Sequence, residues 1–377
     1  MEMQQSDQAA NHRHIPDADI RDHFQGCLLG GAVGDALGAP VEFMSRDKII
    51  AQFGDGGIRD MVPAYGLIGA ITDDTQMALF TAEGLLRAWV RQSSRGICHP
   101  PSVIANAYLR WLHTQGIDHP LHRHCLNGWL IQQKELFAQR APGNTCLLAL
   151  QEMRSSSDRA KNQSKGCGGV MRVAPVGMMM AGQTLSDPTR KSFSLACEVA
   201  AITHGHPTGQ LAAGAFAAII HQLLTGISLV ESIDKALHLL NGKPGHAETS
   251  GAIRQAIKFA ADNPNSTDAL QTIGKGWVAE EALAIGLYCA LCATDIEAGV
   301  ILAVNHDGDS DSTGLIAGHL LGAIHGASGI PQRWLGPLEL RTVLEDVADD
   351  LATVSRWKLD DDAGDEGEYY FDRYPGG

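Results

Sequence analysis

Positive charge is scarce in this sequence. Its 377 residues include 29 lysines and arginines against 43 aspartates and glutamates, which gives a formal net charge of -14 at pH 7. This balance argues against a nucleic-acid backbone as the partner, because phosphate binding normally needs a basic face. An anionic nucleotide can still bind such a chain through metal ions, glycine-rich backbone amides or helix N-termini.

The sequence also lacks the patterns of export and of membrane insertion. Residues 1–14, MEMQQSDQAANHRH, have neither the basic start nor the apolar run of a signal peptide, so we expect a cytoplasmic protein. The longest uncharged stretch, residues 209–230, is rich in alanine and glycine and contains Gln210, His221 and Gln222. These features favour a buried helix over a membrane span.

Signals for disulfides and for strands are equally weak. The eight cysteines show no disulfide framework, and Cys289 and Cys292 fall within an apolar helical pattern, so we expect reduced core thiols. Apolar residues recur at helical spacing in most of the chain. The segments concerned are 75–89, 103–112, 195–202, 211–224, 280–293 and 338–354. The sequence therefore predicts an all-α fold.

We expect one domain over residues 21–358, because no low-complexity linker and no internal repeat divides this part of the chain. The polar residues 1–20 predict a mobile N-terminal arm, which could instead be a partner-binding element. Residues 359–377 are acidic and glycine-rich, and they predict a solvated C-terminal tail.

Glycine recurs at every fourth position in two of the expected helices. The first stripe is Gly26, Gly30, Gly34 and Gly38, and the second is Gly314, Gly318, Gly322 and Gly326. A glycine in a helix interior costs about 1 kcal/mol relative to alanine, so some other interaction must compensate. Close approach of two backbones is the usual compensation, and we expect these two helices to pack against each other at the centre of the fold.

Two clusters of carboxylates precede apolar helices. The segment ITDDTQ, residues 71–76, predicts a capping box formed by Asp73 and Gln76, and the segment NHDGDSDST, residues 305–313, resembles an N-cap with surplus acidic residues. Capping needs only one residue of each segment, and converging carboxylates repel one another unless cations bind between them. All-oxygen ligands favour Mg²⁺, Mn²⁺ or Ca²⁺, and the lack of paired cysteine or histidine argues against zinc.

The spacing of Asp307, Asp309 and Asp311 suggests an EF-hand, but that loop needs glycine where Ser312 stands and glutamate where Gly318 stands. The EF-hand interpretation therefore fails at both diagnostic positions. A two-metal phosphohydrolase remains an alternative, because paired metal ions also serve phosphoryl transfer.

A glycine-rich loop and an isolated histidine are further candidates. Residues 164–172, SKGCGGVMR, could hold a diphosphate through backbone amides or form an ordinary turn, and they match neither a Walker A loop nor a dinucleotide fingerprint. His204 follows an apolar helical run and precedes Pro207, so it either meets a ligand or caps a helix end. A separate histidine-rich segment fits no zinc pattern, and we expect no metal there. Its members are His119, His122, His124 and Cys125.

Five motifs, read in order, resemble those of the ADP-ribosylglycohydrolase family, which includes the hydrolase that reactivates dinitrogenase reductase. They are GCLLGGAVGDALG at 26–38, TDDT at 72–75, GGVMR at 168–172, TH at 203–204 and GDSDSTG at 308–314. The resemblance spans roughly residues 26–326. It implies an orthogonal multi-helix fold whose cleft holds two divalent cations, Mg²⁺ or Mn²⁺.

The resemblance implies metal ligands on both sides of that cleft. They are Thr72, Asp73 and Asp74 on one side, with Asp309, Asp311 and Ser312 on the other. Family members usually carry threonine where Ser312 stands, and serine keeps the hydroxyl ligand while losing a methyl that stiffens the rotamer. Glu42 matches an acidic residue that lies over the reacting ribose in this family, and its alternative is an exposed loop carboxylate.

The resemblance also implies contacts with ADP-ribose. Ser164, Gly166, Gly168 and Gly169 would cradle the diphosphate, and His204 would contact the ligand. Many relatives have asparagine where Cys167 stands, so a side-chain contact is lost here while the backbone amides remain.

The resemblance implies an ADP-ribosyl-protein glycohydrolase that removes ADP-ribose from a modified side chain, with arginine the expected acceptor. Cleavage at the anomeric carbon needs an activated water and a proton acceptor, which are the roles expected of the metal site and of Glu42, Asp74 and Asp311. An alternative is an immunity protein whose residues 1–20 also bind and block an ADP-ribosylating toxin. A catalytically idle relative is disfavoured, because every carboxylate is retained.

Overall fold

The computed structural model describes residues 17–122, 125–359 and 364–376, and within them it confirms the all-α prediction. The only paired strands in this part of the chain are β1 (Pro63–Ala64) and β2 (Leu67–Ile68), which form a short antiparallel hairpin. The helices of the first half are α1 (Asp17–Gly38), α2 (Arg46–Phe53), α3 (Asp73–Arg95), α4 (Pro100–Thr114), α5 (Asn144–Gln151), α6 (Ala174–Ala181), α7 (Pro188–Ala200) and α8 (Pro207–Leu224). Those of the second half are α9 (Leu229–Leu240), α10 (Ala247–Asp262), α11 (Thr267–Ile273), α12 (Ala279–Cys292), α13 (Ile296–Val304), α14 (Ser310–His325), α15 (Gln332–Leu335), α16 (Arg341–Thr353) and α17 (Gly364–Arg373).

The six segments with helical spacing coincide with helices, with boundaries that shift by a few residues. The largest shift is at 195–202, where α7 begins already at Pro188, after the N-cap Asp187. At 338–354, α16 begins only at Arg341 because Leu340 adopts a left-handed conformation at its N-cap. Residues 209–230 span most of α8 and the start of α9, and α8 is almost wholly buried. No helix in the described ranges is long and apolar enough to cross a membrane.

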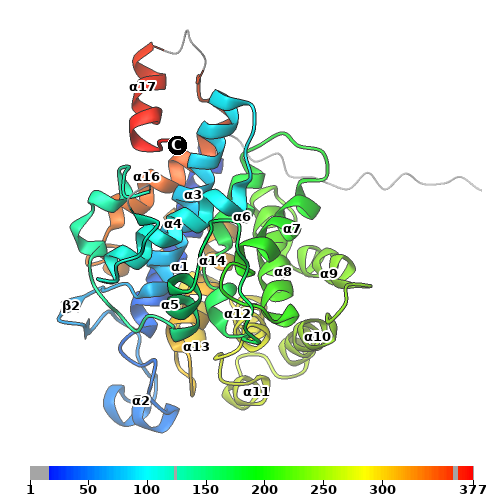
Figure 1. Ribbon diagram of the computed structural model, residues 1–377. Coiled ribbons are helices and arrows are strands. Elements are labelled where there is room, and N and C mark those ends of the chain that lie inside the picture. The colour runs from blue at the N-terminus through cyan, green and yellow to red at the C-terminus, as the bar shows by residue number, and fades with distance from the viewer. Residues whose placement is uncertain (1–16, 123–124, 360–363, 377) are drawn as a thin grey trace, which may run out of the picture.

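Helices α1 and α14 lie side by side at the centre of the molecule, as the glycine stripes predict (Figure 1). A Cβ atom on Gly30 would overlap with the carbonyl of Gly318, and one on Gly34 would overlap with that of Gly314. The contacts run in opposite order along the two helices, so the pair is antiparallel. As a consequence, the end of α1 lies against the start of α14, where Gly38 meets Ser310. The glycine stripes thereby position both ends of the candidate site.

The prediction of a solvated tail over residues 359–377 is wrong for residues 364–376. Helix α17 packs on the domain through Tyr374, which is fully buried, and through Arg373, whose guanidinium lies 3.5 Å from the ring centroid of Trp129. The acidic composition of the segment obscured these aromatic and cationic anchors.

The two ends of the chain share one core, because a continuous cluster of buried residues runs from Phe24 to Tyr374. Helix α1 begins at Asp17, inside the span predicted as a mobile arm. Residues 1–16, which contain most of that arm, lie outside the described residues.

Candidate metal centre

Thr72 caps the N-terminus of α3, and this corrects the capping box predicted for Asp73 and Gln76. The Thr72 side chain accepts a hydrogen bond from the amide of Asp74 at 3.3 Å. The side-chain amide of Gln76 turns away and donates to the carbonyl of Ala138 at 3.1 Å. The two carboxylates that follow Thr72 are therefore not used as caps and are available to ligands.

Asp35, to which the sequence analysis assigned no role, organises the same helix start from α1. Its carboxylate accepts the amide of Thr72 at 3.0 and 3.1 Å and the amide of Thr75 at 3.2 Å. The Thr75 hydroxyl donates to it at 2.5 Å. An aspartate inside the apolar, glycine-striped part of a helix was the one signal that could have revealed it, and Asp35 is fully buried.

A buried ion pair between Arg140 and Glu339 fixes the chain just before α3. Arg140 donates to the carbonyl of Ile71 at 2.8 Å, while its own carbonyl accepts the amide of Asp73 at 3.2 Å. Glu339 accepts the amide of Ile71 at 3.1 Å. The partners are 199 residues apart, so no local pattern predicts this pair.

The second acidic segment also does more than cap a helix. Asp309 is the N-cap residue of α14, yet its side chain makes no capping hydrogen bond. Gly308 has φ 134°, a conformation that favours glycine, and a Cβ atom there would overlap with the carbonyl of Lys275. That carbonyl accepts the amide of Asp309 at 2.8 Å. The turn thus aims the Asp309 carboxylate at the cluster, where the thiol of Cys167 donates to it at 2.8 Å.

The structure brings the predicted ligands together from both segments. The Ser312 hydroxyl donates to the Asp74 carboxylate at 2.6 Å, which joins the start of α14 to the start of α3. One carboxylate oxygen each from Glu42, Asp309 and Asp311 lies within 4.8 Å of the other two. All six predicted ligands are buried, and they are Thr72, Asp73, Asp74, Asp309, Asp311 and Ser312.

The carboxylates disfavour one another's ionised form. Five carboxyl groups around Asp311 have raised pKa values. In each of them burial is the largest cause of the increase, and the negative charge of Asp311 is the second largest cause that raises the pKa. The pKa rises to about 7 for Asp35 and to about 10 for Glu42. The carboxylates concerned are Asp35, Glu42, Asp73, Asp74 and Asp309. Bound divalent cations resolve such repulsion.

Glu42 is buried, with 6% of its surface exposed, so it is not the exposed loop carboxylate of the alternative interpretation. Its Oε2 atom is enclosed and has no hydrogen-bond partner among the described residues. A buried acceptor without a donor needs a cation or a ligand to satisfy it. The oxygen-rich donor set and this orphaned oxygen fit Mg²⁺ or Mn²⁺.

The glycine loop at residues 164–169 lies beside this cluster, but three of its amides are already engaged. The amide of Ser164 donates to the side-chain oxygen of Asn162 at 3.1 Å. The amide of Gly166 donates to the Ser164 hydroxyl at 3.3 Å. The amide of Cys167 donates to the carbonyl of Trp277 at 3.2 Å. The two glycines that follow remain the candidate donors for a diphosphate.

His204 lies beneath that loop, with 1% of its surface exposed. A Cβ atom on Gly168 would approach the His204 ring to 3.2 Å, and one on Gly169 would approach it to 3.4 Å. Burial, followed by the charge of Arg172, lowers the pKa of His204 to about 3, so its ring is neutral at pH 7. In this structure the His204 ring packs against Gly168 and Gly169 of the loop. Its contact with ADP-ribose remains a prediction.

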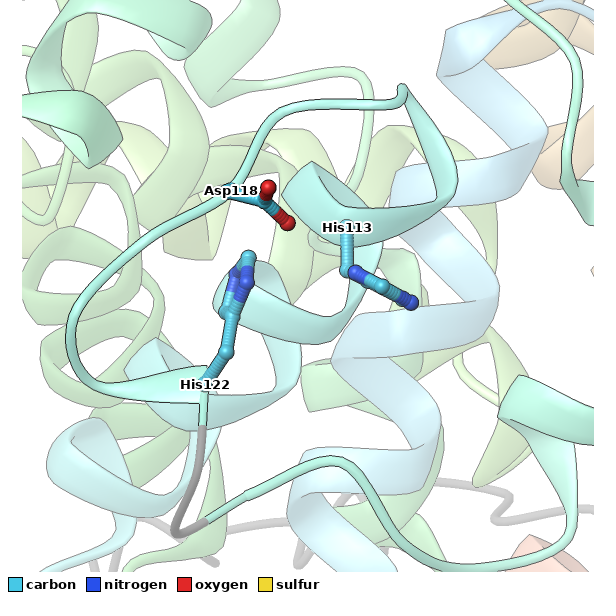
Figure 2. A group of neighbouring side chains, drawn as sticks. All are labelled: His113, Asp118 and His122. Atoms are coloured by element: carbon cyan, nitrogen blue, oxygen red, sulfur yellow. The ribbon is translucent and has the colours of Figure 1, made fainter.

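A second group of possible ligands, His113, Asp118 and His122, lies at the end of α4 (Figure 2). Both ring nitrogens of His122 are engaged, since Nδ1 accepts the amide of His119 at 3.1 Å and Nε2 lies 2.9 Å from a backbone carbonyl of α4. A metal ion bound to His122 would have to replace one of these bonds. Residue 124 of the histidine-rich segment lies outside the described residues.

Comparisons with known proteins agree with this geometry. The chain is similar to the ADP-ribosyl-[dinitrogen reductase] glycohydrolase of Rhodospirillum rubrum, with 26% identity over 341 residues that cover 86% of this chain and 93% of the relative. It is 26% identical to ADP-ribosylarginine hydrolase Tri1 of Pseudomonas putida (strain GB-1) over 333 residues, which cover 88% of this chain and 78% of the relative.

A solved structure described as an ADP-ribosylglycohydrolase-related protein complex superimposes with a TM-score of 0.63 at 28% identity, covering 90% of this chain and 99% of that one. The model of the family described as ADP-ribosylglycohydrolase matches residues 16–360. This match spans nearly the whole described fold and both halves of the carboxylate cluster. The chain therefore belongs to the ADP-ribosylglycohydrolase family.

Proposed function

We propose that this protein hydrolyses the bond between ADP-ribose and an arginine side chain of a modified protein, with two Mg²⁺ or Mn²⁺ ions as cofactors. Family membership supports ADP-ribosyl hydrolase activity, and the printed name of one relative specifies ADP-ribosylarginine. The observation that carries the proposal is the convergence of Asp74 with Ser312, and of Asp309 and Asp311 with Glu42, in one buried cluster.

The proposed ligands are the six buried oxygen donors of that cluster. Cations bound there would supply Lewis-acid activation of a water molecule near the anomeric carbon. Asp74 is fixed by its hydrogen bond from Ser312, and Asp311 accepts the amide of Ser312 at 3.0 Å, so both carboxylates have defined orientations. A rigid donor set of this kind positions the reactants before the reaction begins.

Glu42 is the proposed general base. Its Oε2 atom has no other partner in the described structure. Cations bound among the neighbouring carboxylates would lower its raised pKa, so that the ionised group could accept the proton of the attacking water. The water oxygen forms a bond to the anomeric carbon, the carbon–nitrogen bond breaks, and its electron pair remains on the guanidine nitrogen. Glu42 then returns the proton to that nitrogen, which balances the reaction.

The glycine loop and His204 complete the proposed substrate site. Gly168 and Gly169 would donate to the diphosphate of ADP-ribose, with Ser164 and Gly166 shaping the loop. His204 would act through the loop that it supports. In this proposal the glycine loop forms a wall for the diphosphate, and the carboxylate cluster forms a wall for the reacting ribose.

Replacing Glu42 by glutamine tests the proposed base. We expect kcat for ADP-ribose release from an arginine-ADP-ribosylated protein to fall about 100-fold or more, because the amide cannot accept the proton. The exposed Asp262, at the end of α10, provides the control Asp262→Asn, which should leave kcat unchanged. Unaltered kcat in Glu42→Gln would remove Glu42 from the mechanism.

A further inference from the structure

Two exposed aromatic rings stack on each other beside the carboxylate cluster. The ring centroids of Phe43 and Trp277 are 5.8 Å apart, with an interplanar angle of 17°. Phe43 is 73% exposed and Trp277 is 40% exposed. Large aromatic side chains at the surface are costly unless they serve a contact, and a stacked pair presents flat faces to a ligand.

The two rings come from opposite sides of the candidate site. Phe43 directly follows Glu42 in the turn after α1. Trp277 belongs to a segment that is tied to the glycine loop, because its carbonyl accepts the amide of Cys167 and Val278 pairs with Gly166. The aromatic pair therefore spans from the proposed general base to the proposed diphosphate loop.

A cavity of about 230 Å³ lies next to the pair, and its lining includes charged side chains. The carboxylates of Glu42 and Asp307 line it together with one cation, Lys275. Asp307 accepts the amide of Arg46 at 2.6 Å, whereas the buried Oε2 atom of Glu42 has no donor among the residues described. The cavity thus combines aromatic faces with the carboxylate side chains of Glu42 and Asp307.

We propose that this cavity is the acceptor subsite, which binds the arginine side chain of the modified protein between the Phe43–Trp277 pair and Glu42. A guanidinium group is planar and cationic, so it stacks on aromatic rings and donates several hydrogen bonds to carboxylates. Glu42 also belongs to the carboxylate cluster, so a side chain bound here lies next to the reacting bond. This inference rests on the proposed function and identifies the residues that select arginine over a neutral acceptor such as serine.

Binding of agmatine, which carries the guanidinium group of arginine, tests the proposal without turnover. Calorimetry is performed on the full chain with Mg²⁺ and saturating ADP-ribose, and the matched ligand is N-carbamoylputrescine, the uncharged urea analogue. We expect agmatine to bind at least about tenfold more tightly than the analogue, and Phe43→Ala and Trp277→Ala each to weaken agmatine binding about tenfold. Trp277→Phe should restore most of the affinity, because it keeps an aromatic face.

Phe137 provides the matched control, because it is 48% exposed and does not line this cavity. Phe137→Ala should bind agmatine as the wild type does. Equal affinity of the wild type for agmatine and the urea analogue, or unchanged agmatine affinity in both alanine variants, would overturn the acceptor subsite. Failure of the wild type to release ADP-ribose from modified arginine is a different result, which would refute the proposed hydrolase activity.

Discussion

Replacing Asp311 by asparagine should change stability in opposite directions with and without divalent cations. The charge of Asp311 is the largest charge effect that raises the pKa of Asp73, Asp74 and Asp309. Two unit charges at the 4.8 Å separation that bounds Glu42, Asp309 and Asp311 repel by about 3.5 kcal/mol at an effective dielectric constant of 20. Partial protonation relieves some of this repulsion, so we expect Asp311→Asn to raise the free energy of unfolding of the cation-free protein by about 1–3 kcal/mol at pH 8.

The pH dependence follows from the direction of the pKa shifts. A carboxyl group whose pKa is raised by folding contributes stability that is fully present below its unfolded value near 4 and is lost as the pH rises through its folded value. That folded value is about 7 for Asp35 and about 10 for Glu42. Stabilisation by added cations should therefore grow between pH 5 and pH 8. Burial lowers the pKa of His204, His221, His306 and His319, so their contribution to stability rises with pH. The quantity to compare is therefore the difference in stability between cation-loaded and cation-free protein, in which this contribution cancels.

Thermal unfolding with Mg²⁺ or Mn²⁺, and again with a chelator, measures both effects. Cations at 100 times their dissociation constant should stabilise the wild type by about 2.7 kcal/mol per site, and Asp311→Asn should lose most of this gain. For a chain of this length, each kcal/mol shifts Tm by about 1–2 °C. Asp262→Asn, which removes an exposed carboxylate, should behave as the wild type does. Destabilisation of Asp311→Asn by the same amount under both conditions would refute the electrostatic reasoning.

Two further substitutions test the frame of the site. Gly318→Ala places a Cβ atom against the carbonyl of Gly30, so we expect loss of at least about 3 kcal/mol in urea unfolding or failure to fold, and wild-type stability would contradict the close packing of α1 on α14. Ser312→Thr keeps the hydroxyl that donates to Asp74 and should retain the cation-induced rise in Tm, whereas Ser312→Ala should lose about half of it or more. Equal Tm shifts in these two variants would remove Ser312 from the ligand set.

The central helix pair and both halves of the carboxylate cluster were predictable from the sequence, because they rest on local patterns. A glycine at every fourth position of a helix indicates close backbone packing, and two acidic segments before apolar helices indicate more carboxylates than capping can use. The antiparallel packing of α1 on α14 brings Gly38 against Ser310, and Asp35 of α1 holds the start of α3 beside the same end of α14. These contacts explain why segments so distant in the sequence form one site.

Other features depend on contacts that no local pattern encodes. Asp35 reaches the start of α3 only because the two helices are adjacent in space. The pair of Arg140 and Glu339 joins positions 199 residues apart. The anchors of α17 lie in a segment whose acidic composition is typical of a solvated tail, and the buried Tyr374 and the contact of Arg373 with Trp129 show that it packs. The roles of the residues that the sequence analysis missed therefore depend on tertiary contacts.

The most direct test of the account is release of ADP-ribose from an arginine-ADP-ribosylated protein, measured with Mg²⁺ or Mn²⁺, again with a chelator, and in Asp311→Ala. The account predicts cation-dependent release by the wild type and none by Asp311→Ala, because that variant lacks a proposed metal ligand that lies close to Glu42 and Asp309. Release that persists with the chelator, or in a folded Asp311→Ala variant, would contradict the claim that the buried carboxylate cluster is a catalytic metal site.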